Sequence, residues 1–170
     1  MKKLLLAATL LFGLQSYAQK TYEVYNFTTQ TVQLADIITK AGSIYPEYHS
    51  KPFGLVSIPA GGSYTLVNTA NVFRFPFQSP SSSPYINKWE RLNSAAGPGV
   101  VQTSPIAWTF GNSQVFNRMM FYVGASYNAM PAVPLGVTTL PSWVTGAGWQ
   151  LDYDCSNPAP NVWFYTLVIY

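Results

Sequence analysis

Polar and apolar residues alternate along short stretches of this chain, and clusters of Gly, Pro, Asn and Ser separate the stretches. A period of two is typical of β-strands that bury one face. The pattern therefore predicts a chain of short strands joined by turns. The predicted strands lie at 21–25, 31–39, 55–58, 63–67, 72–77, 100–102, 106–110, 114–123, 149–153 and 162–170.

The last of these stretches, 162–170, is apolar at both alternating sets of positions except at Thr166. Apolarity on both faces predicts a central strand that is covered on both sides. Turn residues at 58–64 and at 111–113 lie between pairs of predicted strands. Each of these two turns predicts a β-hairpin.

Three other stretches carry loop or helix signals. The stretch 40–52 is polar and aromatic, and 78–84 is rich in Ser and Pro, so both are predicted to be loops. The stretch 85–93 has apolar residues at every third position. This spacing predicts at most one short helical turn near 85–93, because so short a helix gains little from its own hydrogen bonds.

The N-terminus has the three-part pattern of a secretory signal peptide. Two lysines precede an apolar core at 4–14, and small residues follow before Gln19. The apolar core is too short to cross a bilayer as a helix, which takes about 20 residues. We therefore expect cleavage near Ala18/Gln19 and a secreted protein, either extracellular or periplasmic. Asn26 begins an Asn-Phe-Thr triplet, the acceptor pattern for glycosylation in a secreted chain.

These features predict an all-β fold, namely an antiparallel β-sandwich of two sheets. The topology stays open between a jelly roll and an immunoglobulin-like arrangement. The sequence shows no heptads, internal repeat or long linker. Residues 1–18 are therefore assigned to the signal peptide and residues 19–170 to a single domain.

Composition and charge exclude several function classes. The chain is 48% apolar and only 9% charged, the opposite of a disordered chain. Its net charge is +3, and Lys2 and Lys3 in the signal peptide supply two of these charges. The other cations are scattered along the sequence. No basic stripe is present to follow a phosphate backbone, so nucleic acid is excluded as a partner.

Few residues are suited to catalysis or to metal binding. The chain has one cysteine, Cys155, and one histidine, His49, which excludes a disulfide scaffold and a zinc site built from several thiolates or imidazoles. Motifs for nucleophilic catalysis or phosphate binding are missing from the sequence. We therefore predict no catalytic residue, no metal and no cofactor. Cys155 is interpreted as a small half-buried side chain, and His49 as a solvated loop residue.

Asp152 and Asp154 are the acidic pair with strand spacing, which would place both side chains on one face. Such a pair is compatible with glycosidase chemistry or with half of a calcium site. The favoured interpretation is that the two residues cap a turn at 154–158. Whether they bind calcium stays open.

Aromatic residues are the main compositional excess, with 5 Trp, 12 Tyr and 10 Phe. Rings on strands are expected to fill the core, whereas rings in loops are candidates for stacking on a ligand. Tyr127 is one such loop aromatic. We predict ligand binding by Tyr45, Tyr48, Trp89 and Trp143. The alternative, in which these rings plug the ends of the sandwich, stays open.

Three function classes are compatible with the sequence. The favoured one is a secreted, non-catalytic module that binds carbohydrate or another cell-surface ligand. The first alternative is a membrane-active or outer-membrane-associated β protein. The second is a secreted hydrolase that uses Asp152, Asp154 or Glu90. The sequence does not identify the ligand or the oligomeric state.

Overall fold

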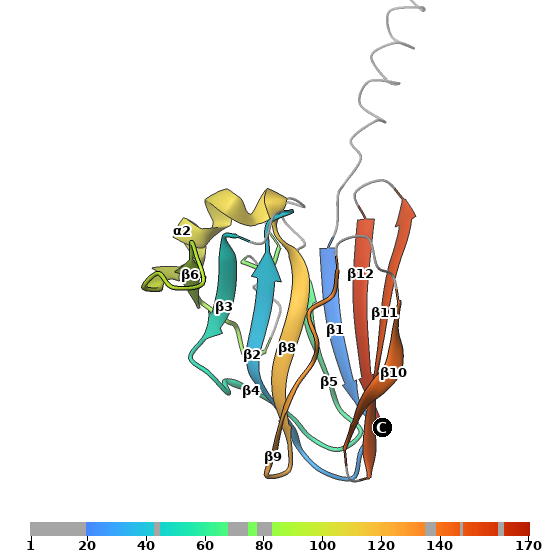
Figure 1. Cartoon of the computed structure of the whole chain (residues 1–170). Coiled ribbons are helices and arrows are strands. Elements are labelled where there is room, and N and C mark those ends of the chain that lie inside the picture. Colours follow the sequence, from blue (N-terminus) through green and yellow to red (C-terminus); the bar gives the residue numbers. More distant parts are fainter. Residues whose placement is uncertain are drawn as a thin grey trace, which may run out of the picture.

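The structure, a computed structural model, describes residues 20–42, 45–67, 75–77, 83–134, 139–146, 148–159 and 162–170. The predicted signal peptide and most of 72–84 lie outside these residues. The described residues are mostly β-strand, which confirms the all-β prediction (Figure 1). The elements are β1 (Lys20–Asn26), β2 (Val32–Lys40), β3 (Glu47–Lys51), β4 (Val56–Ile58), β5 (Ser63–Val67), β6 (Lys88–Leu92), β7 (Val100–Thr103), α2 (Ser104–Ala107), the 3-10 helix η1 (Trp108–Ser113), β8 (Val115–Val123), β9 (Ser126–Ala129), β10 (Thr139–Gly146), β11 (Trp149–Ala159) and β12 (Val162–Ile169).

The strands form two sheets, which lie on opposite sides of the molecule in Figure 1. The five-stranded sheet has the order β10-β11-β12-β1-β5. The seven-stranded sheet has the order β7-β6-β3-β2-β8-β9, with β4 also paired to β2. The described strand pairs are antiparallel except β1 with β12, which is parallel. The expectation of purely antiparallel sheets was therefore wrong, because a strand's own pattern does not specify its partner.

Side chains from both sheets meet in one hydrophobic core. The Tyr22 ring of β1 lies 4.9 Å from the Phe116 ring of β8, and its hydroxyl donates to Met119 Sδ at 3.0 Å. Phe121 of β8 likewise makes an edge contact with Trp149 of β11, at 5.4 Å between centroids. Alternate residues of facing strands therefore fill the space between the sheets, as the period of two predicted.

The predicted loop at 40–52 was wrong, because this stretch contains β3. Tyr48 and Ser50 are buried, whereas His49 and Lys51, which alternate with them, are partly exposed. β3 pairs with β2 on one side and with β6 on the other. The polar character that indicated a loop comes in part from this outward-facing side of the strand. The pairing of β3 with β2 and β6 therefore outweighs the weak local preference of this stretch for a loop.

The helical turn expected at 85–93 was also wrong. Residues 88–92 form β6, which pairs with β3 and β7. Helical structure lies instead at 104–113, where α2 begins with Pro105 in its first turn, a position that suits proline. The predicted strand at 106–110 and its hairpin are therefore wrong, while the strand at 114–123 is confirmed as β8.

The turn at 58–64 does not close a hairpin. β4 pairs with β2 in the seven-stranded sheet, whereas β5 pairs with β1 in the five-stranded sheet. The chain therefore crosses between sheets here, with Gly61 at a φ of 72°. An alternating pattern fixes which face of a strand is buried, but not the sheet to which the strand belongs.

Asn26 holds this crossover in place. Its side-chain amide donates to the carbonyls of Gln30, Ile58 and Pro59 at 2.8, 2.9 and 3.0 Å. Its side-chain oxygen accepts from the Thr28 amide at 3.0 Å. Because Asn26 is fully buried and its nitrogen is engaged, this triplet is a structural motif in the folded protein rather than an accessible glycosylation site.

The C-terminal strands confirm one placement and correct another. β12 lies in the middle of its sheet, between β11 and β1, as predicted. The turn expected at 154–158 is wrong, because β11 continues to Ala159 with an irregular register after Ser156. Asp152 and Asp154 consequently lie on a strand, on the face away from the core.

Candidate functional site

The outer face of the seven-stranded sheet contains an open cavity of about 650 Å³, here called the groove. Its volume is within the range of small-molecule sites, about 300–1,000 Å³. The groove lies over β2 and β8, between the turn that follows β3 on one side and β9 on the other. Its lining residues are Gln33, Ala35, Asp36, His49, Phe53, Gly54, Met120, Tyr122 and Tyr127.

A local irregularity in β2 shapes the floor of the groove. The register between β2 and β8 shifts between Leu34 and Asp36, at the small residue Ala35. The Ala35 carbonyl accepts a hydrogen bond from the Gly54 amide at 2.9 Å, and the Gln33 side-chain amide donates to the Gly54 carbonyl at 2.9 Å. Gly54 has a φ of 71°, which favours glycine. These contacts fix the turn that carries Phe53 beside the groove.

Two aromatic rings form the sides of the groove. Phe53 is 60% exposed and Tyr127 is 56% exposed. The Lys51 ammonium lies 3.2 Å from the centroid of the Phe53 ring, and Tyr127 packs on Tyr122 with their centroids 5.1 Å apart. Each ring is thus held by a neighbour and still presents surface to solvent.

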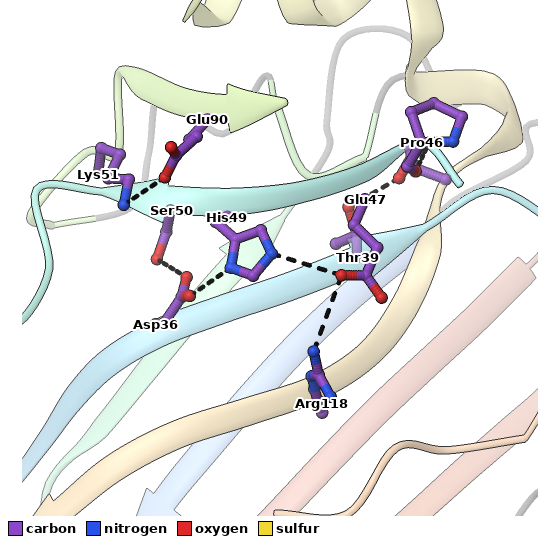
Figure 2. Close-up of polar contacts among 10 residues, drawn as sticks. Asp36, Thr39, Pro46, Glu47, His49, Ser50, Lys51, Glu90 and Arg118 are labelled. Atoms are coloured by element: carbon purple, nitrogen blue, oxygen red, sulfur yellow. Dashed lines mark hydrogen bonds and ion pairs between the residues drawn. The ribbon is translucent and has the colours of Figure 1, made fainter. Parts of the chain in front are cut away.

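A chain of charged groups runs across the outer face beside the groove (Figure 2). His49 Nδ1 lies 2.6 Å from Asp36 Oδ2, and His49 Nε2 lies 3.5 Å from Glu47 Oε2. Only the first contact is a hydrogen bond; the second is an ion pair without hydrogen-bond geometry. Arg118 Nη2 of β8 approaches the same Glu47 oxygen at 3.7 Å. The chain joins β2, β3 and β8.

Asp36 and Lys51 are both paired. The Ser50 hydroxyl donates to Asp36 Oδ1 at 3.2 Å, so both carboxylate oxygens of Asp36 have partners. Ser50 Oγ also accepts from the Ile37 amide at 2.9 Å. Lys51 Nζ forms an ion pair with Glu90 at 2.6 Å. The three carboxylates of this face, those of Asp36, Glu47 and Glu90, are therefore each paired with a cation.

His49 has a raised pKa. Burial lowers the pKa of His49, but the hydrogen bond and charge of Asp36 and the charge of Glu47 outweigh that effect. The charged imidazolium is thus favoured by its two carboxylate neighbours.

Three of the four predicted site residues, Tyr45, Tyr48 and Trp89, do not line the groove. Tyr48 and Trp89 are fully buried and both pack on Phe77, with centroids 4.7 and 5.1 Å apart. Tyr45 is half-buried just before β3. Trp143 falls in β10, and its side chain lies outside the part of the chain that the structure describes. For Tyr48 and Trp89, the structure favours the alternative in which the rings fill the core.

Sequence reasoning placed Tyr127 among the loop aromatics but missed the rest of the groove. His49 was expected to be solvated, yet only 14% of its side chain is exposed. The one available signal was the alternation of Glu47, His49 and Lys51, which is compatible with a strand whose polar face points outward. That signal lay within a stretch interpreted as a loop.

Outside the groove, Asp152 of the acidic pair on β11 is engaged in local contacts. Asp152 accepts from the Tyr170 hydroxyl at 2.7 Å and from the Gln150 amide at 3.1 Å. Within the described residues, no three His, Cys, Asp or Glu side chains are grouped so that they could hold a metal ion. Burial raises the pKa of the Cys155 thiol, which is buried on the inner side of β11.

Comparison with protein-family models, with curated proteins and with solved structures finds no match for this chain. In the part of the chain that the structure describes, no helix is both long and apolar enough to span a bilayer.

Proposed function

We propose that this chain is a secreted, non-catalytic β-sandwich that binds an extracellular ligand in the groove. One observation carries the proposal: two aromatic rings, Phe53 and Tyr127, expose more than half of their surface beside an open cavity. Large exposed rings around a concavity are typical of recognition sites, because most aromatic surface is otherwise buried. Carbohydrate or another cell-surface group is the ligand class.

Two further features support the β-sandwich fold and the export that this proposal includes. The shared core between the two sheets is the packing expected of a β-sandwich. The N-terminal pattern of basic, apolar and small residues supports export across a membrane. A ligand site on an exported protein faces the cell exterior or the periplasm.

The polar groups of the groove support binding rather than catalysis. Ser50 donates to Asp36 and not to His49, so a hydroxyl activated by the imidazole is missing from this trio. The side chains are arranged to stabilise the sheet face and to border a ligand.

The proposal is tested by binding of the exported protein to arrayed glycans and to phospholipid vesicles. Phe53→Ala and Tyr127→Ala should each weaken binding of any captured ligand about three- to tenfold, from the usual contribution of one stacked ring. The matched control is Phe27→Ala, which removes a ring that is 64% exposed and does not line the groove.

Two results would contradict the proposal. The first is a folded wild-type protein that binds none of these probes. The second is binding that the groove variants leave unchanged. Vesicle binding of this second kind would instead favour the membrane-active class.

A further inference from the structure

The groove offers neutral groups to a ligand, although charged residues surround it. We infer that its ligand is an uncharged, hydroxyl-rich ring, such as a neutral pyranose unit of a polysaccharide, rather than a charged sugar or a cation. This inference rests on the proposed function and adds the chemical class of the ligand.

The carboxylates around the groove are each paired with a cation. Lys40 and the exposed Lys88, which lie opposite Glu47 and Lys51 in the strand pairing, do not line the groove. Three carboxylates, those of Asp36, Glu47 and Glu90, face three cations, those of His49, Lys51 and Arg118. Asp36, the one carboxylate that lines the groove, has both oxygens engaged. A charged ligand would have to break one of these pairs and leave a partly buried charge without its partner, which is costly.

The accessible hydrogen-bonding groups that remain in the groove are neutral. His49 Nε2 also makes no hydrogen bond, but this atom is buried and faces Glu47 at 3.5 Å. Within the described residues, the hydroxyls of Tyr122 and Tyr127 make no hydrogen bond. Gln33 donates its amide hydrogen to Gly54, and its carbonyl oxygen makes no hydrogen bond in the same part of the chain. A tyrosine hydroxyl both donates and accepts, and an amide oxygen accepts. This set complements sugar hydroxyls, which also donate and accept.

The aromatic rings favour the same ligand class. Apolar C–H faces of a pyranose ring stack on aromatic faces, whereas its hydroxyls point outward from the ring edge. A cationic ligand would also be attracted to an aromatic face. At Phe53, however, the Lys51 ammonium already lies over the ring, and its charge repels a second cation. An uncharged ring meets no such opposition.

The test measures binding of the full exported chain to three kinds of soluble polysaccharide by affinity electrophoresis at low and high salt. The probes are neutral polymers (glucans, mannans, galactans and xylans), anionic polygalacturonate and cationic chitosan. We expect binding to at least one neutral polymer, with an affinity that salt does not change. Phe53→Ala and Tyr127→Ala should weaken it about three- to tenfold, and Phe27→Ala should not.

A second pair of variants separates stacking from hydrogen bonding. Tyr127→Phe keeps the ring and removes the hydroxyl, so it should weaken binding less than Tyr127→Ala. Thermal melts of each variant show that it is folded.

The inference and the proposed function fail in different ways. Salt-sensitive binding to polygalacturonate or chitosan alone, weakened by the groove variants, would overturn the neutral-ligand inference and leave the groove as a binding site. Binding to a neutral polymer that the groove variants do not weaken would overturn both. A folded protein that binds none of the three kinds of polymer would overturn the inference.

Discussion

His49 is the single histidine of the chain, and its protonation state couples to the charges of the outer sheet face. Asp36 of β2 and Glu47 of β3 contact it directly, and Arg118 of β8 contacts Glu47. Glu90 lies opposite His49 in the pairing of β3 with β6 and is itself paired with Lys51. Loss of the imidazolium proton therefore removes a positive charge from beside the Asp36 and Glu47 carboxylates.

This arrangement predicts a pH-dependent stability. The pKa of His49 is higher in the folded protein than its usual value of about 6.5. Between these two pKa values the folded state binds more protons than the unfolded state, so stability falls as pH rises. The contribution is complete below about pH 6.5 and is lost as pH passes the folded pKa. Urea unfolding midpoints of wild type and His49→Gln between about pH 6 and pH 8 measure it.

The α-amino group titrates in the same pH range. His49→Gln keeps the α-amino group, so any pH dependence that remains in this variant does not come from His49. We expect the fall in the wild-type midpoint to be reduced in His49→Gln. Parallel slopes for the two proteins would show that His49 is not the source of the pH dependence.

At the scale of elements, an aromatic cluster joins the seven-stranded sheet to the helical segment. Trp89 of β6 packs edge-on against Phe77, which also contacts Tyr48 of β3. The Trp89 indole donates to Ser104 Oγ of α2 at 3.2 Å. The cluster therefore connects two neighbouring strands to the segment that follows β7.

Trp89→Ala should consequently destabilise the protein strongly. Removal of a fully buried large ring costs about 3–5 kcal/mol, because it removes transfer free energy and leaves a cavity. Tyr127→Ala, at an exposed ring, should cost less than about 1 kcal/mol. Thermal or urea unfolding measures both variants. Similar small losses in the two would contradict the placement of Trp89 in the core.

At the scale of the whole molecule, the first and last described strands lie side by side. β12 pairs with β1 along seven consecutive residue pairs and with β11 on its other edge. The parallel pairing brings together segments that are far apart in the sequence. The middle of the five-stranded sheet therefore depends on contacts that only the complete fold can make.

Amide hydrogen exchange should reflect this arrangement. Amides of β12 are protected by neighbours on both edges, so they should exchange among the slowest in the chain. Amides of β7 should exchange faster, because β7 pairs with β6 alone and both of its valines are exposed. Exchange measured by mass spectrometry on peptic fragments compares the two strands. Exchange in β12 as fast as in β7 would contradict its central position.

The period of two in the sequence was enough to predict an all-β chain and the positions of several strands. Residues 21–25 and 31–39 correspond to β1 and β2, and 162–170 corresponds to β12. This succeeded because the burial of alternate side chains is a local property of a strand. The two-sided apolarity of 162–170 likewise matches its central place in the sheet.

The partners of each strand were decided only by the tertiary structure. The sequence did not specify that β4 and β5 belong to different sheets or that β1 and β12 run parallel. Residues 47–51 and 88–92 form strands because neighbours on each side satisfy their backbone groups. Their local signals for loop and helix were too weak to prevent it.

The groove, like the pairing of the strands, was decided only by the tertiary structure. Tyr127 lies far from His49 and Phe53 in the sequence, and it becomes their neighbour only when β2 and β8 pair and the turn after β3 folds beside them. The sequence determined how much aromatic surface the chain carries and how little charge. Only the packing of the two sheets decided which rings fill the core and which remain exposed, because burial of a given ring depends on what lies opposite it.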